Sequence, residues 1–139
     1  MENQNSFNQF VNDVTKVRKY SKHLFRIHEL VVHQLNPDEI TQDYQACFYF
    51  LYATAKTVKQ IEKKAIKKGV PVSEIESSKL IELIKTNSGQ LSESLVICHN
   101  LICHRIHLSH FTEKVQNSLY YLAEAANHIK AIEQEIKAA

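Results

Sequence analysis

Glycine, proline and tryptophan are scarce or absent in this chain: its 139 residues include two glycines, two prolines and no tryptophan. Glycine and proline are the residues that most often interrupt regular structure, so their scarcity predicts long helices joined by few turns. The sequence also lacks a run of about 18 uncharged apolar residues, the length that a membrane-spanning helix needs. We therefore expect an all-α protein without a membrane partner.

A strong charge of either sign is missing as well. The formal net charge is +2, which is too small to mark a dedicated nucleic-acid-binding protein. The three cysteines are odd in number and lie in apolar helical patterns, which favours reduced thiols over a disulfide framework. The N-terminal segment has neither the basic nor the apolar region of a secretory signal. These observations predict a cytoplasmic protein with one domain over residues 1–139.

The spacing of apolar residues predicts the helices. A stripe with 3-4 spacing follows residues 7–35, which indicates one long helix. Start and stop signals then predict four more: from Pro37 to Gly69, from Ser73 to about Asn87, from Gln90 or Ser92, and a last one capped by Ser109 or Thr112. The helix after Gln90 is apolar on most sides, so we expect it to be the most buried. The predicted architecture is an antiparallel up-and-down helical bundle of four to five helices.

The segment from Cys98 to His110 concentrates four histidines, two cysteines and an arginine in thirteen positions. Three interpretations compete for it: ordinary structural histidines, a metal site, and a site that cleaves phosphodiesters. The other four histidines each stand alone on a helix turn, so structural or solvent-facing roles are predicted for His23, His28, His33 and His128.

The metal interpretation uses His99, Cys103, His107 and His110, which fall on one face if a single helix runs through them. The four span three turns, so only neighbouring pairs lie within chelating reach and further ligands must come from elsewhere. The compact metal motifs CxxC and HExxH are absent.

The phosphodiester interpretation uses Arg105 and His110, at the junction between the last two predicted helices. RNA cleavage without a metal or another cofactor needs a base for the 2′-hydroxyl proton and a cation for the phosphate, roles that histidine and arginine can fill. If His110 lies in the first turn of the last helix, free backbone N–H groups there would also favour an anion. His104 and His107 are candidate auxiliary residues, and a dimer would bring two such pairs together.

A family resemblance supports this interpretation. The segment DYQACFYFLYATAKTVK (residues 43–59) resembles the second helix of the HEPN superfamily, and is closest to the small helical partners of minimal nucleotidyltransferases. That family carries an Arg-x4-6-His motif between its last two helices, where Arg105 and His110 stand here, and Ser109-His110 is similar to a Ser-His pair of that branch. The resemblance implies a homodimeric, metal-independent endoribonuclease with Arg105 and His110 as catalytic residues. It further implies a toxin–antitoxin or defence role with a nucleotidyltransferase antitoxin as partner.

Two positions depart from the family pattern. Ile106 stands where a polar residue, usually asparagine, follows the arginine, and Thr112 stands where many such toxins have a tyrosine that the partner enzyme modifies. A second register, His99-Asn100 followed by His104, matches the motif with histidine in place of arginine. This register predicts the alternative function, a catalytically inactive helical binding module that partners a nucleotidyltransferase or another protein.

Overall fold

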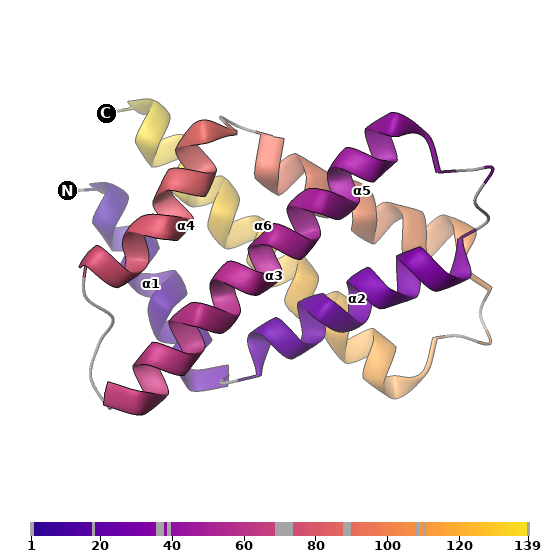
Figure 1. Ribbon diagram of the computed structural model, residues 1–139, viewed down its shortest axis with the longest axis horizontal. Coiled ribbons are helices and arrows are strands. Elements are labelled where there is room, and N and C mark those ends of the chain that lie inside the picture. The colour runs from indigo at the N-terminus through magenta and orange to yellow at the C-terminus, as the bar shows by residue number, and fades with distance from the viewer. Residues whose placement is uncertain are drawn as a thin grey trace.

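The computed structural model describes residues 2–17, 19–35, 38, 40–68, 74–87, 90–107, 109 and 111–138. The regular elements of these residues are six α-helices, arranged as a bundle (Figure 1). They are α1 (Glu2–Val17), α2 (Tyr20–Gln34), α3 (Gln42–Lys68), α4 (Glu74–Thr86), α5 (Gln90–Arg105) and α6 (Glu113–Ala138). The all-α bundle expected from the sequence is confirmed. None of these helices has both the length and the apolarity that crossing a bilayer demands.

The prediction of one helix over residues 7–35 is wrong, because the chain breaks after Val17 and starts again at Tyr20. Lys19 leaves the helical conformation, with φ −124° and ψ 24°, and offers no side-chain cap to α2. The first turn of α2 also contains no acidic residue. Because the first N–H groups of any helix lack partners within it, this start needs acceptors from another part of the protein.

Glu62 of α3 supplies these acceptors. Its Oε1 accepts the backbone N–H of Ser21 at 2.7 Å, and its Oε2 accepts the Ser21 hydroxyl at 2.8 Å. Both residues are buried. Burial raises the pKa of the Glu62 carboxyl, and the hydrogen bonds from Ser21 act in the opposite direction. A carboxylate at a helix N-terminus is also favoured by the helix dipole. The break therefore persists because a residue 41 positions away stabilises it.

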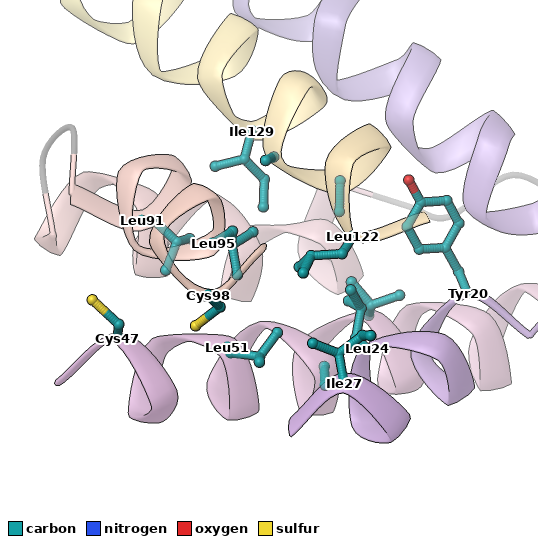
Figure 2. Packing of buried hydrophobic residues seen from close by; sticks show 14 of the residues in the cluster. Tyr20, Leu24, Ile27, Cys47, Leu51, Leu91, Leu95, Cys98, Leu122 and Ile129 are labelled. Carbon is teal, nitrogen blue, oxygen red and sulfur yellow. The ribbon is translucent and has the colours of Figure 1, made fainter. Parts of the chain in front are cut away.

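One hydrophobic cluster fills the interior and draws on all six helices. Figure 2 shows its centre, where Leu24 and Ile27 of α2 and Leu51 of α3 meet side chains of α5 and α6 such as Leu95 and Leu122. These five side chains are fully buried, and each contributes roughly 1.5–3 kcal/mol relative to an exposed position. The bundle is therefore held mainly by apolar packing among α2, α3, α5 and α6.

The three cysteines are free thiols, as the sequence predicts. Cys47 and Cys98 are buried in the core between α3 and α5 (Figure 2), whereas Cys103 is exposed. Burial raises the pKa of both buried thiols, so they stay protonated and behave as small apolar side chains.

The structure gives more exact starts for two predicted helices and shows how far α5 is buried. Thr112 caps α6, since its Oγ1 accepts the N–H of Val115 at 3.2 Å. The second predicted helix begins at Gln42 instead of Pro37. The predicted signals at Asn36, Pro37, Gly69 and Ser73 lie outside the described residues. The helix α5 is not buried all round, because Val96 is 45% exposed.

We expect Glu62→Ala to lower the free energy of unfolding by about 1–3 kcal/mol, because it leaves the buried N–H of Ser21 without an acceptor. Glu62→Gln retains an oxygen at this position and should lose clearly less. Urea unfolding of the two variants measures the difference, and amide exchange at Ser21 should accelerate in the alanine variant. Equal stability of wild type and Glu62→Ala would show that Glu62 does not hold the start of α2.

Candidate active site

The C-terminal end of α5 carries the arginine singled out from the sequence. Arg105 is the last residue of α5, and His104 precedes it in the same turn. An arginine at this position suits the negative end of the helix dipole. Ile106 closes the turn, because its N–H donates to the carbonyl of Ile102 at 3.3 Å and its side chain is buried. The backbone beneath Arg105 is therefore fixed by the core.

An open pocket of about 530 Å³ lies beside this helix end, between α5 and the start of α3. Its lining residues are Tyr44, Ile97, Asn100, Leu101, His104 and Arg105. Asn100, His104 and Arg105 are exposed, whereas Tyr44 is half-buried. Residues four positions apart share a helix face, which is why Asn100 and His104 lie together. A volume of this size is in the range of small-molecule sites.

The pocket brings together the donors and the proton-transfer group that phosphate chemistry uses. The Arg105 guanidinium presents fixed N–H donors, and Asn100 and Tyr44 add an amide and a phenol. His104 adds an imidazole, which can accept or donate a proton near neutral pH. Sequence reasoning missed Tyr44, because the packing of α3 on α5 that turns it toward this pocket leaves no local signal.

His99 belongs to the other side of α5. It lines a smaller cavity of about 160 Å³ against α6, together with Leu95, Val96, Ala123, Ala126 and Asn127. Its Nδ1 lies 3.7 Å from the Sγ of Cys103, and burial lowers its pKa. The register that pairs His99 with His104 thus combines two residues that line different pockets.

Three residues of the metal interpretation, His99, Cys103 and His107, do not line one helix face, because α5 ends at Arg105 and His107 lies beyond it. Ser109 fixes the His107 ring, since its backbone N–H donates to His107 Nδ1 at 3.1 Å. Within the described residues, no three or more histidine, cysteine or acidic side chains are grouped to hold a metal ion.

His110 lies outside the described residues. The helix α6 begins at Glu113. Its start is capped by the hydroxyl of Thr112, one of the two caps that the sequence predicts.

His23 is not the isolated histidine that the sequence predicted. Its Nδ1 lies 3.0 Å from the hydroxyl of the buried Ser118, which also accepts a hydrogen bond from Arg26 Nη1 at 3.0 Å. The ring stacks on Tyr121, with centroids 4.5 Å apart. Burial, followed by the charges of Arg26 and Lys22, lowers the pKa of His23. Sequence reasoning missed this cluster because Ser118 and Tyr121 come from α6.

Two more histidines also have partners on other helices. His28 packs against the ring of Tyr52 on α3 at 5.1 Å, and His128 Nε2 contacts the carboxylate of Asp13 on α1 at 2.7 Å. The expected structural roles of these histidines agree with such contacts, but their expected isolation is wrong. His33 is exposed, which agrees with the predicted structural or solvent-facing role.

Comparisons with protein-family models, curated proteins and solved structures found no match for the chain.

We expect the free energy of unfolding to fall as the pH drops from 7 toward 5. Burial lowers the folded-state pKa of His23, His28 and His99, so the unfolded chain binds more protons below its histidine pKa of about 6.5. Stability is then fully present above that value and is lost as the pH falls through the lowered values. Glu62, whose pKa is raised, acts in the opposite direction at lower pH.

Urea unfolding at several pH values measures this slope. His99→Gln should flatten the slope, because glutamine takes up no proton. His104→Gln, which removes an exposed imidazole from the same helix, serves as the control and should change the slope less. An unchanged slope in His99→Gln would contradict the assignment of part of the pH dependence to this half-buried ring.

Proposed function

We propose that this protein is a metal-independent endoribonuclease of HEPN type, with its site at the end of α5. The observation that carries the proposal is the shared pocket of Arg105, His104 and Asn100, which opens to solvent beside Tyr44. A phosphate can approach an arginine that stands at an exposed helix end over a fixed backbone. The motif resemblance supplies His110 as the second proton-transfer residue.

The reaction is the transfer of the phosphate from its 5′ oxygen to the neighbouring 2′ oxygen. One histidine takes the proton of the 2′-hydroxyl, and this oxygen bonds to phosphorus while the bond to the 5′ oxygen breaks. Another histidine, which starts the step protonated, gives its proton to the departing 5′ oxygen. The products are a 2′,3′-cyclic phosphate and a 5′-hydroxyl. Phosphorus keeps its oxidation state and the two histidines move the protons, so the proposed step needs neither an oxidant or reductant nor a metal ion. Arg105 holds the phosphate as negative charge grows on its oxygens.

His110 and His104 fill the two proton-transfer roles in this proposal, and His107 supports them. The neutral His107 ring carries its proton on Nε2, because Nδ1 accepts from Ser109. The resemblance supports a homodimer that joins two copies of the site, and a toxin–antitoxin or defence role beside a nucleotidyltransferase antitoxin. The free thiols support a cytoplasmic location. These features belong to the same proposal.

We expect the purified protein to cleave single-stranded RNA in EDTA. Arg105→Ala should slow cleavage by about 10²–10³-fold, because the charge on the phosphate loses its partner. His104→Ala and His110→Ala should each slow it by about 10²–10⁴-fold. Arg105→Lys keeps the charge without the planar fork and should fall between wild type and Arg105→Ala. Labelled RNA on denaturing gels gives the rates.

Two controls make this test decisive. Lys130→Ala removes an exposed cation from α6 at a different pocket and should cleave at the wild-type rate. A substrate with a single 2′-deoxy nucleotide should resist cleavage at that position, because the attacking oxygen is missing. Equal cleavage by wild type, Arg105→Ala and His110→Ala would reject the site. A wild-type protein that leaves RNA intact would reject the enzyme and favour the binding module.

The proposed dimer has its own test. We expect a mass of twice 16.1 kDa in size-exclusion chromatography with light scattering. Because each site is expected to need both copies, specific activity should fall when dilution separates them. A monomer that retains full activity would contradict the paired site and leave the single pocket as the active unit.

A further inference from the structure

A second concentration of aromatic and basic side chains lies over α2, away from the pocket at the end of α5. The helix α2 runs beside α3 and crosses α6 (Figure 1). On the α6 side, Tyr120 is 59% exposed and packs edge-on against Tyr121 at 5.2 Å. Tyr121 in turn stacks on His23. This side thus presents an exposed aromatic ring on a rigid support.

The α3 side of α2 has a second aromatic ring with cations above it. Tyr52 is 41% exposed and packs against Phe25 of α2 at 5.7 Å. Lys56 Nζ lies 5.6 Å from the centre of the Tyr52 ring, and Lys59 Nζ lies 5.8 Å from that of Phe25. Such cation–π contacts keep lysine side chains over rings while their ammonium groups remain in solvent.

Two basic residues, Lys22 and Arg26, belong to the helix between these two rings. Lys22 is exposed on α2, and Arg26 one turn later is held by its hydrogen bond to Ser118. Both charges disfavour protonation of His23, which indicates a positive field at this position. Glu29 is the one acidic residue of α2. An anion that approaches α2 from solvent therefore meets cations on both sides of the helix.

We propose that this surface binds single-stranded RNA. The α2 face, as we call it, consists of Lys22, Arg26, Tyr52, Lys56, Lys59 and Tyr120. Its cations pair with backbone phosphates, and its two exposed tyrosines stack on bases. Stacking on a tyrosine requires a base that is not already stacked in a duplex, so the face selects single strands. The choice of RNA rests on the proposed function, whereas the binding itself does not need cleavage.

The experiment measures binding of a 5′-fluorescein-labelled 12-mer of 2′-O-methyl uridine to the full chain by fluorescence anisotropy. The 2′-O-methyl group removes the nucleophile, so cleavage does not disturb the measurement. We expect Tyr120→Ala to weaken binding roughly tenfold or more, and Tyr120→Phe to restore it. The triple variant Lys22→Ala/Lys56→Ala/Lys59→Ala should weaken binding and reduce the slope of log K against log salt by about 2.

The matched control is Lys85→Ala/Lys130→Ala/Lys137→Ala. It removes the same charge from three exposed lysines around a pocket formed by α4, α5 and α6, so it should bind like wild type. Equal weakening by both triple variants would overturn the proposal, as would equal affinity for a 12-base-pair duplex. Full displacement by polyglutamate at the same charge concentration would also overturn it and indicate an acidic protein partner.

The two experiments distinguish the RNA-binding surface from the nuclease site. Binding that depends on the α2 face without any cleavage of unmodified RNA supports the face and rejects the nuclease. Cleavage that depends on Arg105, with an unchanged KM in the Lys22/Lys56/Lys59 variant, supports the nuclease and rejects the face. Thermal unfolding checks that each variant is folded. We expect the Tyr120 variants to fold, because this side chain is exposed.

Discussion

The hydrogen bonds from Ser21 to Glu62 determine how the N-terminal third of the chain is arranged. Without an acceptor for the first N–H groups of α2, the apolar stripe over residues 7–35 would favour one straight helix. Glu62 provides that acceptor from α3, so α1 ends at Val17 and α2 takes a new direction. Both α1 and α2 pack on α3 and α6. The surface that carries Lys22 and Arg26 between Tyr52 and Tyr120 depends on the same two hydrogen bonds.

Local patterns were enough to predict most helices, since amphipathic spacing and caps act within one or two turns. The break before α2 was missed because it has no glycine or proline and its partner is far along the chain. Ser21 is a polar residue within the apolar stripe over residues 7–35, and the structure explains why it stands there: its hydroxyl donates to Glu62. His23 was misjudged for the same reason, because its partners Ser118 and Tyr121 belong to α6.

The candidate site was predictable to the extent that it follows helix geometry. Asn100 and His104 are four residues apart and share a face, whereas His99 and His104 are five apart and do not. In a continuous helix through residues 99–104, His99 and His104 therefore lie on different sides, which disfavours the register that pairs them. The two pockets on α5 agree with this geometry. The contribution of Tyr44 was beyond sequence reasoning, because it depends on how α3 packs against α5. The end of the helix at Arg105 depends on the burial of Ile106, which apolar spacing alone does not fix.

Helix α3 connects the two surfaces proposed here. Tyr44 in its first turn lines the pocket beside Arg105, and Tyr52 lies on the α2 face. Eight residues of α-helix separate these tyrosines, which corresponds to about 12 Å along the axis. Both belong to the segment of residues 43–59 whose pattern resembles the HEPN superfamily. The rigid helix α3 fixes the distance between the proposed binding surface and the proposed cleavage pocket. An RNA strand bound to the surface would therefore stay near the pocket after each cleavage. Binding energy from bases away from the scissile phosphate would then position that phosphate at Arg105, which is how remote contacts accelerate a reaction.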